Sequence, residues 1–593
     1  MKRKIIHRAF CLILGASLLS GCGTDTSSNN DTETTLSLVD NSAWNYEEDA
    51  DVYWQVGISY CESPANSSYE TLGIYVPGAY MDAEDNGDGT YTCTLNTESE
   101  IEGYTAESAP IVIPVNTPGY SAQDAPTEYS ESVSEYTSAG FIYVWAGCRG
   151  RDDGAPAGVT DLKAAIRYIR YNEGNIAGDM DSIFSFGMSG GGAQSALLGS
   201  TGDSDMYTAY LEEIGAVMDT SDAVAGSMCW CPITSLDIAD EAYEWNMGVT
   251  RTNLSDDEQE LSDDLAEEFA NYINELEITD EDGNVLTLEK SSEGIYQAGS
   301  YYEYVKSVIE DSLEDYIKNE SYKTSSNTNS MGGMPSGQAP TDDMPLGDLP
   351  TDDVEGSIPS GEKPDGLPDD EQAQYAKDGV ERDTSNLNTS TSETYDTAEE
   401  YIESLNEDNE WVTYDSSTGE VTITSIADFV KACKNSSKSL GAFDQLDAGQ
   451  AENTLFGYGD GQGAHFDSIL ASLLSENDYG TDYTSNYEED LKKTDSLGNT
   501  VEYRSNMYNP LYFLSDYYDG YNTSTVAKYW RIRTGINQSD TSLTTEINLA
   551  LALRAYGVDV DFATIWSQGH TEAESTGDST SNFINWINEC LEN

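Results

Sequence analysis

The segment around Ser189 has the residue types and spacing of a serine nucleophile held on a tight turn. An apolar stretch, 182–186, leads into the pattern Gly187-x-Ser189-x-Gly191, and a small-residue helix is expected over 193–198. Glycines beside the serine remove side chains that would collide with the strand and the helix, so the hydroxyl can project from the turn. The amide of Gly190 would then face the oxygen of a reacting carbonyl group. The five-residue pattern alone is weak in a glycine-rich chain, so the strand and helix around it carry the prediction.

The chain has only three histidines, which limits the choice of a general base. His570 follows the last expected strand, 558–566, whereas His465 lies in a middle region with no strand before it. A serine on such an elbow is followed along the chain first by an acid and then by the histidine. We therefore assign His570 as the base and interpret His465 as a packed or loop residue.

The acid should follow the penultimate strand, expected over 526–532, and Asp540 is the first carboxylate after that strand. Asp540 has two interpretations. It is either the acid that orients His570 or the N-cap of a helix expected over 544–556, since aspartate, serine and threonine cap helices well. We prefer the acid role.

A second oxyanion amide is expected from the loop after a strand over 110–115. That loop reads Asn-Thr-Pro-Gly-Tyr, and Pro118 has no N–H. Thr117 or Gly119 is therefore the expected donor. Arg149 and Arg151 follow the next strand at the same sheet edge, where they either contact substrate or form structural ion pairs.

Alternating strands and helices position these residues. Further strands are expected over 139–145 and 223–230, and a helix over 161–170 has apolar residues at helical spacing. This order predicts an α/β fold whose mostly parallel sheet is covered by helices on both faces. Residues 52–115 read as short strands, with a hairpin turn at 85–89.

The middle of the 593-residue chain interrupts that alternation. Acidic amphipathic helices are expected over 256–276 and 301–317. Residues 324–374 contain no aromatic residue and seven of the 16 prolines, so we expect a disordered acidic insert there. The formal net charge of −81 makes nucleic acid or an anionic membrane surface a very poor partner.

The N-terminus has the pattern of a bacterial lipoprotein leader. A basic start and an apolar run precede Leu-Ser-Gly-Cys, which predicts a signal peptide over 1–22 and lipidation at Cys22. The expected location is outside the cytoplasmic membrane, attached to the cell envelope. Seven of the nine cysteines follow Cys22, an odd number thinly spread, so neither a disulfide scaffold nor a metal site is expected.

Five segments resemble the bacterial tannase and feruloyl-esterase family of α/β hydrolases, including its lipoprotein-like members. They are GVTDLKAAIRY (158–168), FGMSGGGAQS (186–195), WCPI (230–233), AENTLFG (451–457) and WRIR (530–533). The resemblance spans about 50–593 apart from the insert. It implies an α/β-hydrolase fold and a Ser–Asp–His triad that cleaves gallate or hydroxycinnamate esters without a cofactor. It also implies that Lys438, Glu452 and Asp540 bind the hydroxyl groups of the aromatic ring.

The chain departs from the family pattern at one position. Relatives carry Asp-x-Asp after the penultimate strand, the first as triad acid and the second at the ring, whereas Gln538 occupies the first place here. Either Asp540 takes the acid role, or the triad is weakened, or the alignment is shifted. Alternative functions are a generic carboxylesterase, an acetyl esterase or peptidase on the same fold, and a non-catalytic surface lipoprotein.

The expected organisation has seven parts. They are a leader (1–22), a spacer (23–44), the first part of the hydrolase core (45–248), a helical cap (249–323), the acidic insert (324–395), a cap and substrate-binding segment (396–520) and the last part of the core (521–593).

Overall fold

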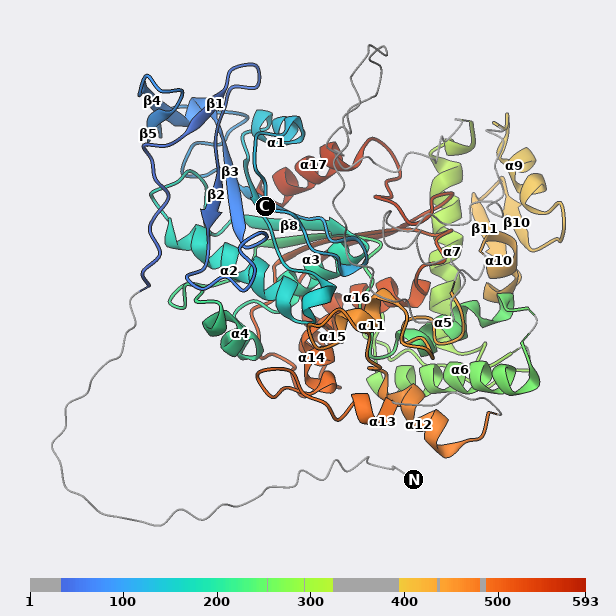
Figure 1. Cartoon of the computed structure of the whole chain (residues 1–593). Coiled ribbons are helices and arrows are strands. Elements are labelled where there is room, and N and C mark those ends of the chain that lie inside the picture. The colour runs from blue at the N-terminus through green and yellow to red at the C-terminus, as the bar shows by residue number, and fades with distance from the viewer. Residues whose placement is uncertain are drawn as a thin grey trace, which may run out of the picture. The chain divides into compact units, whose positions relative to one another are not determined.

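A nine-stranded sheet forms the centre of the fold, in the order β1-β2-β3-β7-β6-β8-β9-β12-β13 (Figure 1). The computed structural model describes residues 34–252, 254–292, 294–323, 394–434, 438–479 and 487–592. The expected leader, Cys22 and the expected disordered stretch 324–374 lie outside the described residues. Residues Leu36–Asn593 form one unit.

The sheet combines an antiparallel edge with a parallel centre. Strands β1 to β3 and β7 pair in antiparallel fashion, whereas β7, β6, β8, β9, β12 and β13 pair in parallel. The strands are β1 (Asn45–Glu47), β2 (Val52–Ser59), β3 (Thr71–Pro77), β6 (Ile111–Val115), β7 (Ile142–Ala146), β8 (Ile183–Met188), β9 (Gly226–Trp230), β12 (Tyr529–Gly535) and β13 (Asp559–Ile565). The carboxyl ends of the parallel strands therefore meet at one edge, where ligands bind in such sheets.

Two layers of helices cover the sheet. Apolar residues of α2 (Ala157–Tyr171), α3 (Gly190–Ser200) and α16 (Leu543–Tyr556) join one buried cluster, and those of α1 (Ser134–Ser138) and α17 (Ser579–Glu592) join another. Strand β7 shows the two faces: Ile142 and Val144 belong to the first cluster and Tyr143 to the second. This alternation follows from the two-residue period of a strand. The expected fold class, an α/β-hydrolase sheet with helices on both faces, is confirmed.

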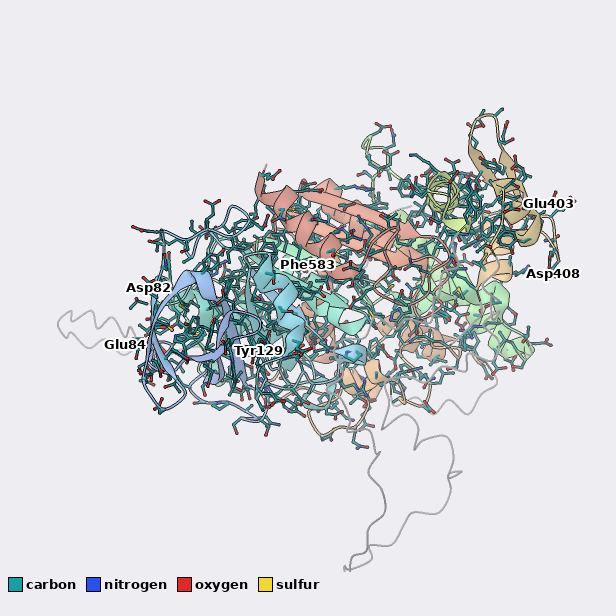
Figure 2. All side chains as sticks on the ribbon, turned by 90° about the horizontal axis from the view of Figure 1, so that it is seen from above. Asp82, Glu84, Tyr129, Glu403, Asp408 and Phe583 are labelled. Atoms are coloured by element: carbon teal, nitrogen blue, oxygen red, sulfur yellow. The ribbon has the colours of Figure 1, made fainter. Side chains whose placement is uncertain are left out.

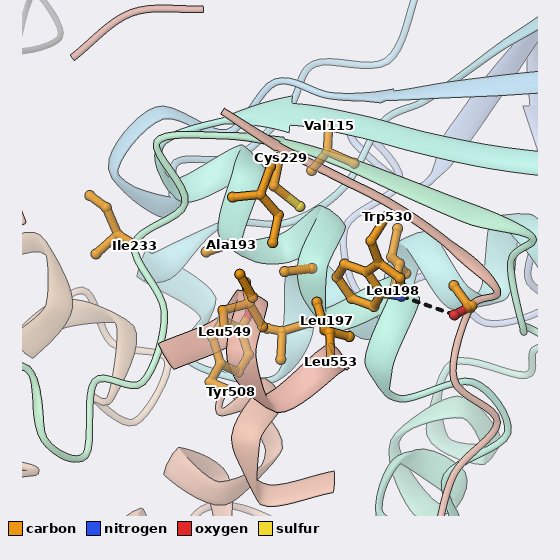
Figure 3. Packing of buried hydrophobic residues seen from close by; sticks show 14 of the residues in the cluster. Val115, Ala193, Leu197, Leu198, Cys229, Ile233, Tyr508, Trp530, Leu549 and Leu553 are labelled. Carbon is orange, nitrogen blue, oxygen red and sulfur yellow. Dashed lines mark hydrogen bonds between the residues drawn. The ribbon is translucent and has the colours of Figure 1, made fainter. Parts of the chain in front are cut away.

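Helix α3 packs tightly beneath the sheet (Figure 3). Leu197 and Leu198 are fully buried, and Trp530 of β12 donates its indole N–H to the carbonyl of Ala527 at 2.9 Å. Burying a leucine side chain stabilises a fold by about 1.5–3 kcal/mol. The helix behind Ser189 is therefore held firmly in place.

A cap is inserted between β9 and β12. It comprises α5 (Ala239–Met247), α6 (Asp256–Leu276), α7 (Ser300–Lys318), α9 (Ala398–Leu405), β10 (Val412–Asp415), β11 (Glu420–Ile423), α10 (Ile426–Cys433), α11 (Ala451–Leu455), α12 (Ser468–Glu476), α13 (Tyr487–Asp490), α14 (Val501–Met507) and α15 (Pro510–Leu514). Helix α4 (Thr208–Glu213) precedes β9 and lies outside this insertion. Ser255 and Glu258 form a capping box that fixes the start of α6. The β10–β11 hairpin was not predicted, because its residues alternate over only four positions on each strand.

The expected hairpin at 85–89 is confirmed as the turn between β4 (Met81–Asp85) and β5 (Tyr91–Leu95). Figure 2 shows exposed acidic side chains on this hairpin, Asp82 and Glu84, and others in the cap, Glu403 and Asp408. Among the described residues, no helix combines the length and apolar character needed to cross a bilayer.

Candidate active site

Ser189 occupies the turn between β8 and α3 in a backbone conformation that serine rarely adopts. Its φ is 60° and its ψ −124°, and its amide donates to the carbonyl of Trp230 at 2.9 Å. Strain of this kind costs about 1–3 kcal/mol and persists only where the surroundings impose it. A Cβ on Gly191 would lie 2.1 Å from the carbonyl oxygen of Val115, so only glycine lets α3 approach β6 this closely. The elbow expected from the sequence is present.

The loop 117–120 lies against the first residue of α3. The position that a Cβ of Gly190 would occupy is 3.2 Å from the amide nitrogen of Gly119. Gly119 has a φ of 53°, and Arg151 donates to its carbonyl oxygen at 2.6 Å. The Thr117 hydroxyl is used differently, as a donor to Gln194 at 3.0 Å. The Thr117 amide nitrogen lies 3.3 Å from the position that a Cβ of Gly191 would occupy, so the amides of both Gly119 and Thr117 lie beside the start of α3 as possible partners of Gly190 at an oxyanion.

His570 lies on the loop after β13, and its ring is almost completely buried. Its Nδ1 is 2.8 Å from Oε1 of Gln538, whereas Oδ2 of Asp540 is 3.9 Å from the same nitrogen. The hydrogen-bond partner of Nδ1 is therefore the amide, not the carboxylate that we preferred as the acid. The cap interpretation of Asp540 is wrong, because Ser542 caps α16 and accepts from the Thr544 amide.

Gln538 is itself held by a buried polar network. Its Nε2 donates to Oε1 of Glu546 at 2.8 Å and to the Thr534 hydroxyl at 3.1 Å. Glu546 is fully buried on α16, and burial raises the pKa of its carboxyl to about 8 against the opposing effect of Lys434. These contacts join β12, α16 and the loop after β12 behind His570.

Lys434 is a site residue that the sequence analysis did not identify. Its side chain is buried just after α10, and its Nζ has no hydrogen-bond partner among the described residues. Burial lowers its pKa to about 8, although the carboxylates of Glu546 and Asp540 favour the charged form. A second lysine, Lys431, precedes it by three positions and is exposed, so the sequence held no signal that distinguished the two.

Glu452 lies on α11 beside the loop 117–120, the oxyanion loop. It is 3% exposed, and its Oε2 has no hydrogen-bond partner among the described residues. The neighbouring Ala451 lies 3.8 Å from the position that a Cβ of Gly119 would occupy, and Glu452 contributes to the raised pKa of the buried Tyr120 hydroxyl. A buried acceptor without a partner is costly unless a ligand satisfies it.

Lys438 is half-buried and lies over one ring of an aromatic pair. Its Nζ lies 3.9 Å from the centroid of the Phe443 ring, which packs edge-on against Tyr243. The Tyr243 hydroxyl donates to the carbonyl of Ser539, next to Asp540, at 2.9 Å. Lys438 is therefore linked to the segment that carries Asp540 through Phe443 and Tyr243.

Two other candidates have structural roles. His465 forms a 2.7 Å hydrogen bond between its Nδ1 and Oδ1 of Asp444, and its ring stacks on Tyr487, so it is packed inside the cap. Arg149 binds Asp161 through both its Nε and Nη2 groups, which is the ion-pair interpretation. Within the described ranges, no group of three or more His, Cys, Asp or Glu side chains is arranged to hold a metal ion.

Comparisons with known proteins agree with this architecture. The profile of the BD-FAE family matches residues 101–266. A tannin acyl hydrolase from Lactobacillus plantarum is 25% identical with a TM-score of 0.61, and the alignment covers 91% of this chain and 94% of that one. A Fusobacterium nucleatum tannase is 26% identical with a TM-score of 0.62, covering 91% and 95%.

The chain is similar to the bacterial tannases along most of its length. This tannase-like chain has the α/β-hydrolase fold of those enzymes, and the two comparisons support an esterase on that fold. Two similar structures are tannin acyl hydrolases in complex with a ligand, 3,4-dihydroxybenzoate in one and ethyl gallate in the other. Each protein is 25% identical to this chain, and each alignment covers 91% of this chain and 94% of that one. Their TM-scores are 0.62 and 0.61. A search of curated sequences found no match.

Proposed function

We propose that the tannase-like chain is a serine esterase that works through an acyl-enzyme. His570 takes the proton of Ser189, whose oxygen attacks the ester carbonyl, and the amides of Gly190 and Gly119 stabilise the oxyanion. His570 then protonates the departing alcohol. Water attacks the acyl-enzyme by the same steps in reverse, with no cofactor. The observation that carries the proposal is the strained Ser189 turn at the sheet edge where the His570 loop begins.

We further propose that the acyl group is a hydroxylated aromatic acid of the gallate or hydroxycinnamate type. Support comes from Glu452, a buried carboxylate with an unsatisfied oxygen beside the oxyanion loop. Lys438 and Asp540 are the other residues expected to bind ring hydroxyls, and Lys434 is a second lysine of suitable chemistry. The gallate and dihydroxybenzoate complexes of similar proteins support the same substrate class.

An ester panel tests this substrate class. Methyl gallate and a methyl hydroxycinnamate should be cleaved at least about tenfold faster than methyl benzoate, because unpaired buried polar groups disfavour a plain ring. Lys438→Ala and Glu452→Gln should each reduce that preference and leave methyl benzoate turnover nearly unchanged. Equal rates on all three esters would instead indicate a generic carboxylesterase.

One observation favours a second candidate, a surface-binding protein without catalysis. Gln538 places a neutral amide where a triad normally has a carboxylate, and a neutral partner stabilises a protonated histidine less. Such a protein would bind the same aromatic esters and release them unchanged. Binding of methyl gallate measured by calorimetry, together with the absence of product, would identify this case.

The proposed location is the outer side of the cytoplasmic membrane, with the chain attached through lipid on Cys22. The Leu-Ser-Gly-Cys pattern that ends the expected signal peptide supports this location. Expression with a labelled fatty acid should mark the wild-type chain in the membrane fraction and leave Cys22→Ser unlabelled. Equal labelling of both chains would remove Cys22 as the attachment site.

A further inference from the structure

The side-chain amide of Gln538 lies between His570 and the buried acid Glu546. Gln538 is 3% exposed and Glu546 0% exposed, so both side chains are shielded from solvent. The distances from Nδ1 of His570 to Oε1 of Gln538 and from Nε2 of Gln538 to Oε1 of Glu546 are both 2.8 Å.

A glutamine side chain can face a histidine with either end, and the two orientations have opposite consequences. When the oxygen faces Nδ1, the proton sits on Nδ1 and the lone pair of Nε2 is free to accept a proton from Ser189. When the amino group faces Nδ1, the histidine proton moves to Nε2, and the ring cannot act as a base. The wrong tautomer of a triad histidine costs up to about 10⁴-fold in turnover.

Glu546 distinguishes these two orientations. Oε1 of Glu546 accepts from both Gln538 and Thr534, whereas Oε2 has no partner among the described residues, so a proton bound by this acid belongs on Oε2. Oε1 therefore stays an acceptor and favours the amino end of Gln538. The Thr534 hydroxyl acts in the same sense. It donates to Glu546 at 3.2 Å, which leaves a lone pair for the amino group of Gln538 at 3.1 Å.

The charge of Glu546 is balanced by its surroundings. Lys434, at the end of α10, and the thiol of Cys231, in the segment after β9, both interact electrostatically with Glu546. Asp540 also interacts with Lys434. Helix α5, which also packs against α16, contributes the neutral Asn246, which accepts from the Leu543 amide. Lys434 is the cation of this group, and its charge opposes the burial that raises the pKa of Glu546 to about 8.

We propose that Glu546 is a positioning residue that fixes the amide of Gln538 so that its oxygen faces His570. In this arrangement the neutral Gln538 takes the structural place of the triad acid, and the nearby charge lies one side chain further back. The proposal rests on the proposed function, because the tautomer of His570 matters only if that ring acts as a base.

A charge exchange between the two side chains tests the proposal. Glu546→Gln removes the selection between the amide ends, so it should lower kcat at least about tenfold with a smaller change in KM. The double exchange, Glu546→Gln with Gln538→Glu, restores one carboxylate and one amide, with the carboxylate now at His570. It should return kcat to within about threefold of the wild type or above it. A double exchange that is no more active than Glu546→Gln would overturn the proposal.

The tautomer of His570 gives a readout that does not depend on turnover. The full chain has three histidines, so ¹⁵N-histidine spectra can be assigned with His465→Gln and His570→Ala. The wild type should show the Nδ1–H form of His570. Glu546→Gln should raise the Nε2–H population, and the double exchange should reverse that change. An unchanged Nδ1–H form in Glu546→Gln would overturn the proposal.

Matched variants separate this effect from a general loss of folding. Glu70→Gln replaces another fully buried glutamate, one that accepts from the Asn66 amide, and it should leave the His570 tautomer unchanged. If Glu546→Gln fails to fold because it leaves Lys434 without its counter-charge, Glu546→Gln with Lys434→Met avoids that penalty. The paired variant should show the same tautomer change. A wild-type chain that cleaves no ester would overturn the proposed function and leave the tautomer result standing.

Discussion

The two halves of the candidate active site are built in different ways. The nucleophile half depends on backbone geometry: the φ of Ser189 and the close approach of Gly191 to Val115. The histidine half depends on side chains from separate segments, with Gln538, Glu546 and Lys434 buried together behind His570. The first half should respond to changes in shape, whereas the second should respond to changes in charge.

The largest effect is expected at the nucleophile. Ser189→Ala removes the attacking oxygen, so kcat on methyl gallate should fall by about 10⁴-fold or more. The melting temperature should hardly change, because alanine fits the same turn. Turnover retained in this variant would remove Ser189 from the mechanism.

A change of shape should damage the nucleophile half as a unit. Gly191→Ala would place a methyl group 2.1 Å from the Val115 carbonyl, and relieving that overlap should cost about 3 kcal/mol of stability. It should also lower kcat by about 100-fold, since the turn moves with the helix. Gly248→Ala meets only side-chain atoms, the Ser262 hydroxyl at 3.3 Å and a Glu244 carboxylate oxygen at 3.4 Å, and serves as the control. Equal denaturation midpoints for both variants would contradict the close packing.

The charge-dependent half should make stability depend on pH. Burial raises the folded pKa of Glu546 to about 8 from an ordinary value of 4.5, so the folded state binds the proton more tightly than the unfolded chain. Stability should therefore rise as pH falls from about 7 to about 5. Urea unfolding should show that Glu546→Gln removes roughly 2 kcal/mol of this rise. A slope identical to that of the wild type would show that Glu546 does not titrate there.

The smallest effect is expected at Asp540. Its carboxylate lies 3.9 Å from Nδ1 of His570, so Asp540→Asn should lower kcat only about tenfold through the lost charge. It should leave the melting temperature unchanged, whereas Ser542→Ala should cost about 1 kcal/mol as the true helix cap. A loss of several orders of magnitude at Asp540 would mean that this carboxylate replaces Gln538 at Nδ1 during the reaction.

The same contrast explains what the sequence could predict. The elbow, the parallel strands and the position of His570 follow from local patterns, because glycine spacing and apolar alternation are written in consecutive residues. Gln538 could be recognised as the departure from the family pattern, but its contact with His570 joins two segments 32 positions apart. Glu546 and Lys434 could not be predicted, since a charged residue in a helix or directly after one gives no local sign that it is buried.

Labelling of the full chain with a fluorophosphonate probe tests the central claim most directly, because the probe reacts only with a serine activated by a base. One adduct per chain is expected by intact mass, located on Ser189 by peptide mapping. Methyl gallate should slow its formation, and it should be absent from Ser189→Ala and His570→Ala. An unlabelled wild-type chain, or an adduct on another residue that persists in Ser189→Ala, would contradict the central claim.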